Sequence, residues 1–524
     1  MTDPSTVAVI GAGFSGVLTA LRLLLVSNGP RVLLIERGAR FGRGAAYSTT
    51  SPHHLLNVRA TNMSAFGEEP AHFLDWLAAA GVDEPAKAFV TRDRYGQYLQ
   101  SLLRKAAADG GSAGRLTLEH DEVLGLSRES DHWRVQLALG RALTADAVVL
   151  ALGNLPPPAP VEIDQALVNS GRYVADPWAW DPADTPADGG VLLLGSGLTA
   201  VDITLSIQAQ RPGLRVTALS RRGLLPRRHG DGAPPAAPAH APKGSPLGVL
   251  REIRRRAAGD WRGAIDGLRP YVQALWRGWS LKERTAFLRH LRPWWDVHRH
   301  RLAPEVAADI EEFQRAGLLT ITAGRLGHLQ AAAGGVEAAW TPRGGGGLVT
   351  RRFAIVVNCA GPRGDLAHCD DPLIAGLFAA GEIRPDSCRL GVDVDSRSRA
   401  IGADGEARET LFAVGPITRG QFYEITSVPD IRIQAADCAG AILNVLSLRA
   451  RRLEAPSAGA ERIVADLAAL LSESLDELDV ELGGLKFSRR VRNAWELRGR
   501  RAALDEIALW LDGRRGRVAR GGRR

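Results

Sequence analysis

Three glycines near the N-terminus have the spacing of a turn that holds a dinucleotide. Gly11, Gly13 and Gly16 follow an apolar, β-branched run at residues 6–10 and open a stretch with helical spacing of apolar residues. The first glycine allows a tight turn, the second lets the backbone approach a pyrophosphate, and the third lets the helix pack on the strand. The next strand-like run ends at Glu36, where a carboxylate can accept hydrogen bonds from ribose hydroxyls. This context predicts a dinucleotide site, although the glycines alone would also fit an ordinary glycine-rich turn.

A second segment of the same kind lies in the middle of the sequence. Gly195 and Gly197 follow a strand-like run, and alanine stands where the third glycine would be. No acid closes the next strand, which is followed instead by Ser220, Arg221 and Arg222. Two arginines beside a hydroxyl favour the 2′-phosphate of NADP over NAD. An ordinary βαβ unit with a basic loop is the alternative.

Together, the two segments predict flavin chemistry. The first ends in an acid and the second in arginines, which favours FAD on the first and NADPH on the second. A hydride donor and a flavin on one chain imply reduction of the flavin. The residues predicted to hold FAD at the first turn are Gly11, Gly13, Phe14, Ser15, Gly16, Glu36 and Arg37. Those predicted to hold NADPH are Gly195, Ser196, Gly197, Leu198, Thr199, Ser220, Arg221 and Arg222.

Two strand-like runs that end in glycine turns mark where the chain changes domain. They lie at residues 145–154 and 353–362, and a strand leaving a sheet explains them equally well. We expect an α/β fold with two Rossmann-like dinucleotide-binding domains, in which the NADPH domain interrupts the FAD domain. The predicted boundaries are 1–155 and 351–450 for the two parts of the FAD domain, and 156–350 for the NADPH domain.

A helical insertion and a helical C-terminal extension complete the expected architecture. Residues 247–317 have helical spacing, follow a Pro/Ala-rich loop at 231–246, and are expected to cover the cleft. Residues 451–524 are expected to form two amphipathic helices within 457–512 and then a disordered tail. The insertion also contains a periodic set of tryptophans, more typical of a core than of a ligand site. They are Trp261, Trp276, Trp279, Trp294 and Trp295.

The charge of the chain is concentrated at its C-terminus. Of the 524 residues 45% are apolar, enough to bury a sizeable core. Residues 489–524 contain 12 arginines and 4 acids, which accounts for the whole net charge of +8. A protein that binds nucleic acid over its whole surface is therefore not expected. The arginine tail is interpreted as a solvated or partner-contacting appendage.

Cysteine spacing and hydropathy exclude further classes. None of the four cysteines forms a C-x-x-C pair, which argues against a dithiol redox pair, a zinc ribbon and a disulfide framework. The N-terminus carries no basic, apolar signal segment, and its first apolar run is too short to span a bilayer. We expect a cytoplasmic protein that does not enter a membrane.

Further motifs resemble one family of flavoproteins. They lie in the segments Phe41–Thr49, Leu56–Val58, Asn62–Phe66, Phe89–Arg92, Tyr95–Tyr98, Trp295–Arg301, Gly415–Thr426 and Pro429–Arg432. With them, residues 5–445 resemble the FAD/NAD(P)-binding family with a nine-type NAD-binding fold. That family is similar to class B flavin monooxygenases, including amino-acid N-hydroxylases. One departure is Pro416 after Gly415, where related flavoproteins often have Gly-Asp against the flavin; Pro416 offers only its carbonyl.

The resemblance implies a monooxygenase. In that mechanism NADPH reduces the flavin, oxygen adds to give a C4a-hydroperoxyflavin, and one oxygen atom passes to a small nucleophilic substrate, an amino-acid amine being one candidate. Bound NADP⁺ would keep water away. For Asn57 and Met63, loop hydrogen bonding and core packing are the alternatives to flavin contact. The further residues implied to contact FAD are Arg43, Tyr47, Asn57, Met63, Gly415, Pro416 and Thr426.

The segment 296–301 is the best candidate for binding an anionic substrate such as an acidic amino acid. It contains Arg299, and arginine forks suit carboxylates; a solvated basic face is the alternative. No metal is expected, because on a helix His298 and His300 would point about 200° apart. Arg299 and Glu424 are predicted to be catalytic, although Glu424 would equally serve to cap a helix.

Two other functions stay open at the level of sequence. One is an NAD(P)H-dependent flavin reductase or oxidase without oxygen transfer. The other is a non-catalytic flavoprotein that senses redox state. The expected partners are a small-molecule substrate and O₂, with neither nucleic acid nor membrane.

Overall fold

The computed structural model describes residues 4–82, 88–109, 114–186, 189–230, 240, 242–257, 260–366 and 369–454. Residues 1–445 form one compact unit and residues 446–524 a second. The helices predicted within 457–512, the arginine tail and most of the proline-rich loop at 231–246 lie outside the described residues.

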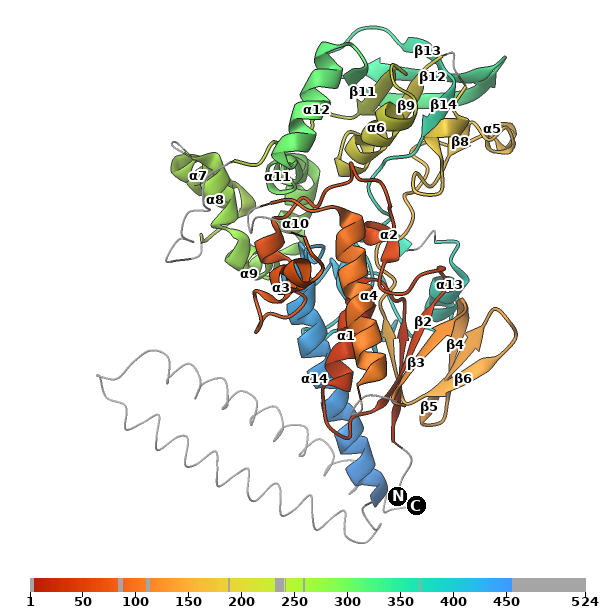
Figure 1. The fold of residues 1–524 in the computed structure, drawn as a ribbon, viewed down its shortest axis with the longest axis vertical. Helices are drawn as coiled ribbons and strands as arrows, with labels where there is room; N and C mark the ends of the chain where they lie inside the picture. Colours follow the sequence, from red (N-terminus) through yellow and green to blue (C-terminus); the bar gives the residue numbers. More distant parts are fainter. Residues whose placement is uncertain are drawn as a thin grey trace, which may run out of the picture. The chain divides into compact units, whose positions relative to one another are not determined.

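A six-stranded sheet carries the first glycine turn (Figure 1). Its order is β15-β16-β7-β1-β2-β3, and all neighbours are parallel except β15 and β16. The last two strands in sequence pair beside β7, so the returning segment completes a sheet that the N-terminal segment begins. The strands are β1 (Thr6–Ile10), β2 (Arg31–Glu36), β3 (Leu116–His120), β7 (Ala147–Leu150), β15 (Arg399–Ile401) and β16 (Ala407–Ala413).

A seven-stranded sheet carries the second glycine turn. Its order is β13-β12-β11-β10-β9-β14-β8, parallel from β8 to β11 and antiparallel from β11 to β13. The central strands are apolar and buried on both faces, as is typical of parallel strands. The strands are β8 (Tyr173–Val174), β9 (Val191–Leu194), β10 (Val216–Ser220), β11 (Leu319–Ala332), β12 (Gly335–Pro342), β13 (Val349–Phe353) and β14 (Ile355–Val357).

Helices and a small antiparallel sheet cover the six-stranded sheet. The antiparallel sheet has the order β4-β5-β6, with β4 (Val123–Glu129), β5 (His132–Leu137) and β6 (Ala142–Ala145). The long helices α1 and α4 lie beside each other (Figure 1). The helices are α1 (Phe14–Leu24), α2 (Gly44–Tyr47), η1 (Ala60–Asn62), α3 (His72–Ala79), α4 (Arg92–Ala108), α13 (Pro372–Ala379), η6 (Gly415–Thr418) and α14 (Val428–Glu454).

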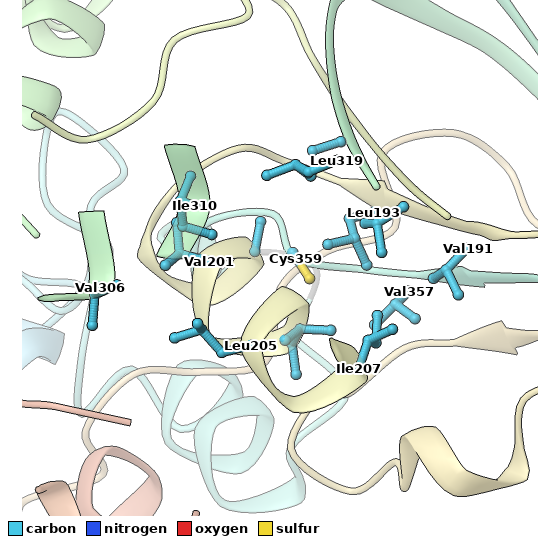
Figure 2. Packing of buried hydrophobic residues seen from close by; sticks show 14 of the residues in the cluster. Val191, Leu193, Val201, Leu205, Ile207, Val306, Ile310, Leu319, Val357 and Cys359 are labelled. Carbon is cyan, nitrogen blue, oxygen red and sulfur yellow. The ribbon is translucent and has the colours of Figure 1, made fainter. Parts of the chain in front are cut away.

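The core around the second sheet is built from apolar side chains of α6 (Leu198–Gln210), α12 (Pro304–Arg315) and the strands. Figure 2 shows these side chains converging on α6 from the strands and from α12. Nine of the thirteen residues of α6 are buried, because the helix packs between the sheet and α12. Smaller elements of this part are α5 (Gln165–Asn169) and η2 (Pro182–Asp184). The buried side chains shown include Val191, Leu193, Val201, Leu205, Ile207, Val306, Ile310, Leu319, Val357 and Cys359.

Between β10 and β11 the chain forms the expected helical insertion. Trp276 is fully buried, as predicted for the tryptophan set, but Trp294 is 43% exposed, so the set as a whole is not a closed core. The elements before α12 are α7 (Pro246–Arg256), α8 (Trp261–Asp266), η3 (Arg269–Tyr271), α9 (Val272–Gly278), α10 (Leu281–Ala286), the π-helical turn η4 (Phe287–Leu291) and α11 (Arg292–Arg299).

The α/β fold with two Rossmann-like sheets is confirmed, and the exact domain boundaries stay a prediction. In the described residues one helical stretch, Val428–Ala450, is long and apolar enough to cross a membrane. Of that window 39% is buried, and core helices of proteins that never enter a membrane meet the same criterion. The predicted cytoplasmic location therefore also stays a prediction.

Candidate functional site

The first glycine turn has the tight geometry that its sequence predicts. Gly11 has φ +99°, and a Cβ atom there would lie 2.5 Å from the Ala151 carbonyl oxygen. A Cβ atom on Gly16 would lie 1.8 Å from the Gly11 carbonyl oxygen. Neither position can take a larger residue without moving backbone, because real Cβ atoms do not approach oxygen so closely. The turn is thus held against the end of β7.

The second turn repeats this arrangement at the other sheet. Gly195 has φ +129°, and a Cβ atom there would lie 2.4 Å from the Cys359 carbonyl oxygen at the end of β14. The third position holds Ala200, which is buried. The two strand-end runs that marked domain boundaries in the sequence therefore each support one glycine turn. Spacing alone did not reveal this role.

Both turns lead into helices whose first N–H groups have no side-chain cap. The N-cap residues are Gly13 for α1 and Gly197 for α6, and neither can offer a side-chain acceptor. Several other helices in the described residues begin with a capping side chain, among them α4, α7, α8, α10 and α13. Uncapped N-termini carry free donors and the positive end of the helix dipole, which suits phosphate groups.

Glu36 at the end of β2 helps to shape the first turn. Its carboxylate oxygens accept hydrogen bonds from the backbone N–H groups of Ala12, at 2.7 Å, and Gly38, at 2.8 Å. Each oxygen retains a second lone pair, so contact with ribose hydroxyls stays a prediction. The neighbouring Arg37 is paired with Glu122 at 3.0 Å.

At the second turn the predicted 2′-phosphate residues lie together after β10. Ser196 Oγ lies 2.8 Å from Ser220 Oγ and 2.6 Å from the Leu224 carbonyl oxygen. Arg222 donates to the Arg289 carbonyl at 3.4 Å, whereas Arg221 is exposed. Leu198 and Thr199 form the first turn of α6, where their N–H groups are among the uncapped donors.

The segment after β2 crosses the first turn. A Cβ atom on Gly44 would lie 2.9 Å from the Gly13 Cα atom. The buried Arg43 is ion-paired with Asp93, so its charge is already compensated by protein. The Tyr47 and Tyr95 rings lie 4.8 Å apart, and burial raises the pKa of Tyr47. Tyr47 therefore carries no charge near neutral pH.

Asn57 and Met63 are not equivalent. Met63 is 2% exposed, which favours the core-packing alternative. The Asn57 backbone carbonyl accepts a hydrogen bond from His229 Nε2 at 3.0 Å, and the pKa of His229 is lowered to about 4, chiefly by burial. Asn57 thus ties its loop to the segment after β10.

The returning segment contacts the first turn directly. Gly415 has φ +77°, and a Cβ atom there would lie 2.2 Å from Ser15 Oγ. The Gly415 N–H donates to Gln434 Oε1 at 2.8 Å, so it is used inside the protein. Pro416 follows in the turn η6, and Thr426 is exposed, with its N–H 2.6 Å from the Glu424 carbonyl oxygen. Contacts of these residues with FAD stay predictions.

Glu424 is the centre of a buried charge cluster at the end of the returning segment. Its Oε1 accepts a hydrogen bond from Trp295 Nε1 at 2.8 Å and lies 3.6 Å from His300 Nε2. Its Oε2 lies 3.3 Å from Arg299 Nε. Burial raises the pKa of Glu424, but His300, Arg299 and the Trp295 N–H outweigh it and hold the pKa at about 2. The two residues predicted to be catalytic therefore form an ion pair, although they lie far apart in sequence.

The backbone of Glu424 is also unusual. It has φ +68°, a left-handed conformation that is uncommon outside glycine. Such a conformation costs on the order of 1–3 kcal/mol and persists only where the surroundings impose it. The contacts with Arg299, His300 and Trp295 supply that constraint.

Asp296, His300 and Glu424 also have the residue types of a metal site, with ligand atoms within 4.8 Å of one another. Cationic side chains already compensate both acids, because Arg292 lies 3.3 Å from Asp296 and Arg299 is paired with Glu424. This charge balance favours a salt-bridge cluster over a metal site. His298 bonds instead to the Trp294 carbonyl at 2.7 Å.

A buried polar network joins the two sheet regions, and sequence reasoning missed it. His54 Nε2 lies 2.9 Å from both the Asp202 carbonyl oxygen and Ser206 Oγ on α6. Asp202 is paired with Arg92 at 2.8 Å. Burial raises the pKa of Asp202, and Arg92 and His54 oppose that shift. No local spacing signals this network, because its members come from three distant segments.

Residues 8–155 match the sequence model of a family described as FAD-NAD(P)-binding. This match confirms the predicted resemblance for that part of the chain and agrees with the predicted FAD and NAD(P) cofactors. No curated protein matches the sequence significantly.

Solved structures of several hydroxylases have a similar fold. An ornithine N-hydroxylase from Kutzneria sp. 744, with reduced FAD, NADP⁺ and L-ornithine, is 16% identical with a TM-score of 0.56, covering 84% of this chain and 98% of that one. An ornithine hydroxylase from Pseudomonas aeruginosa is 15% identical with a TM-score of 0.59, covering 84% and 99%. A cadaverine monooxygenase from Erwinia amylovora, bound to FAD, is 14% identical with a TM-score of 0.57, covering 85% and 95%. At these identities the likeness establishes the fold.

Proposed function

We propose that this protein is an FAD-dependent, NADPH-using monooxygenase that transfers one oxygen atom to a small nucleophilic substrate. The observation that carries the proposal is the pair of uncapped helix N-termini, α1 and α6, each behind a glycine turn in one compact unit. One such turn would serve a single nucleotide, whereas two suit a flavin and its reductant. The fold shared with amine-hydroxylating enzymes supports oxygen transfer.

The residues at both turns fit the two cofactors. FAD would be held by the Gly11–Gly16 turn, with Ser15 beside Gly415 of the returning segment. NADPH would be held by the Gly195–Thr199 turn, with Ser220 and the arginines after β10 nearest its 2′-phosphate. When bound, FAD accepts a hydride and activates oxygen, while the protein supplies orientation.

Glu424 is better suited to holding structure than to moving protons. With a pKa of about 2 it stays ionised at neutral pH, and a general base works best with a pKa near the operating pH. Its carboxylate fixes Trp295 and Arg299 of α11 against the returning segment. Arg299 remains our candidate for binding an anionic group of the substrate.

A disulfide reductase is the less favoured alternative. All four cysteines are free thiols, and two of them, Cys359 and Cys438, are buried. Burial raises the pKa of Cys359, Cys388 and Cys438, so their reactive thiolate forms are suppressed. These thiols are unsuited to accept electrons from a flavin as a pair.

The proposal is tested with purified protein loaded with FAD. Under anaerobic conditions NADPH should bleach the flavin absorbance, and readmitted oxygen should restore it. A screen of small amines and other nucleophiles should then identify a compound that gains one oxygen atom, detected by mass spectrometry, in proportion to the NADPH consumed. Bleaching without an oxygenated product in any screen would support a reductase or oxidase. Bound flavin that NADPH cannot bleach would support a redox sensor.

A further inference from the structure

The helical insertion lines a half-open cavity of about 410 Å³ that the cofactor turns do not use. It lies among α7, α8, α9, η4 and α11, and Tyr423 of the returning segment also lines it. Aliphatic and aromatic side chains make up most of the lining, and the aromatic ones are Trp261, Trp276, Trp279, Phe287, Trp294, Trp295 and Tyr423.

Three of the lining tryptophans use their indole N–H groups in bonds to the protein. Trp276 Nε1 donates to the Gly420 carbonyl at 2.7 Å, Trp279 Nε1 to the Gly244 carbonyl at 3.0 Å, and Trp295 Nε1 to Glu424. A bound molecule would therefore meet apolar surface and aromatic edges, where burial of apolar area is the main source of affinity.

The charged groups that line the cavity are all basic. They are Arg254 and His290, both exposed, and His298, whose Nδ1 is bonded to the Trp294 carbonyl. Among the described residues no carboxylate lines the cavity; the nearby Glu424 accepts a hydrogen bond from Trp295 and is compensated by Arg299. A flexible diamine would find no counter-charge for its second ammonium group here.

The cavity is contiguous with the segment that contacts the first glycine turn. Trp276 stacks on Tyr423, with ring centroids 4.5 Å apart, and Trp295 is bonded to the next residue, Glu424. The same segment includes Gly415, which lies against Ser15. A molecule in the cavity would thus touch the segment that runs to the predicted flavin site.

We propose that this cavity binds the apolar, ring-containing body of the substrate. The identification of the ligand as a substrate rests on the proposed function. Its volume suits one to three fused or linked rings, roughly two to three times the ~150 Å³ that accommodates benzene. It also falls in the range of about 300–1,000 Å³ found for small-molecule sites. The substrate class is therefore an aromatic or otherwise apolar molecule, unlike the ornithine and cadaverine in the names of the structural neighbours.

The test is calorimetric binding to FAD-loaded protein without NADPH. Tryptamine and indole-3-acetate carry the same ring system with opposite charges, and cadaverine carries amines without a ring. Both indole compounds are expected to bind at least tenfold more tightly than cadaverine. Equal or tighter binding of cadaverine would overturn the proposal.

Two matched substitutions on α7 locate the binding. Leu250 lines the cavity, whereas Leu247 on the same helix is 52% exposed and does not line it. Leu250→Trp should weaken binding of both indole compounds at least tenfold, and Leu247→Trp should leave it unchanged. Leu275→Trp on α9, which also fills the cavity, is the second variant should the first lose its flavin. Unchanged binding in a folded, flavin-loaded cavity variant would refute the site.

Failure of the two proposals is distinguishable. If indoles bind at the cavity but NADPH never bleaches the flavin, the ligand site stands and the monooxygenase proposal falls. If NADPH bleaches the flavin but no indole binds, the cavity inference falls alone.

Discussion

Replacing Arg221 by alanine tests the assignment of NADPH to the second glycine turn. Arg221 lies just after β10, is exposed, and has no ion-pair or hydrogen-bond partner among the described residues. Arg222 is half-buried and already donates to the Arg289 carbonyl. Because Arg221 is not used by the fold, its removal should change cofactor binding rather than stability.

The size of the effect follows from the exposure of this side chain. A hydrogen bond to a charged group contributes about 1.5–3 kcal/mol, and exposed ion pairs contribute as little as about 0.2–1 kcal/mol because of screening. For an exposed arginine on a phosphate we expect about 1–2 kcal/mol, which is roughly a 5- to 30-fold loss of kcat/KM for NADPH. NADH has no 2′-phosphate, so its kcat/KM should change less than twofold, an estimate that follows from the missing group.

The assay is anaerobic reduction of bound flavin by each nucleotide. Arg215→Ala is the matched control. Arg215 is exposed at the opposite end of β10, and its replacement removes the same charge. The reasoning is refuted if Arg221→Ala weakens NADPH and NADH equally, if it has no effect on NADPH, or if the Arg215 control gives the same loss.

Three further predictions follow from the geometry of the turns and the charge cluster. In Gly11→Ala and in Gly195→Ala the added Cβ meets a carbonyl oxygen within 2.5 Å. Gly11→Ala should abolish FAD retention, measured by flavin absorbance. Gly195→Ala should retain FAD but lose reduction by NADPH, measured by bleaching of that absorbance. Ionised Glu424 stabilises the fold above about pH 4.5, and this contribution is lost as the pH falls toward its pKa of about 2. Glu424→Gln should therefore lower the free energy of unfolding at pH 7 by on the order of 3 kcal/mol. It should also flatten the pH dependence of that free energy between about pH 5 and 3, as measured by urea unfolding. Replacing Cys369 and Cys388 together by serine should leave flavin reduction unchanged, and a loss would revive the disulfide reductase.

The elements predicted from sequence are those whose signals are local. An apolar strand-like run, closely spaced glycines and an apolar helical pattern fall within about twenty residues at Gly11 and again at Gly195, where Ala200 replaces the third glycine. Each signal depends on backbone conformation and near-neighbour packing, so the chain around it carries the information. The contacts of those glycines with Ala151 and Cys359 are not local, and the sequence revealed the supporting strands only as boundaries.

The candidate site was less predictable because through-space contacts define it. Glu424 and Arg299 were chosen by resemblance, and their pairing through Trp295 could not be inferred from spacing. His54 and Asp202 gave no signal, since a lone histidine and a helical acid are common in any sequence. The tryptophan set was interpreted as core, and only packing shows that all five of its rings line a cavity.

If the proposed cavity binds the substrate, substrate choice comes from the insertion rather than from the turns. The glycine turns bind parts of the cofactors that are the same in every flavin enzyme, so they cannot distinguish one substrate from another. Trp295 is one link between the two regions, because its ring lines the cavity while its N–H donates to Glu424. Trp276 is a second link, since it lines the cavity and donates to the Gly420 carbonyl, and Tyr423 lines the cavity directly. If the cavity binds the substrate, these contacts connect its binding to the segment that leads to the predicted flavin site, without any change in the glycine turns.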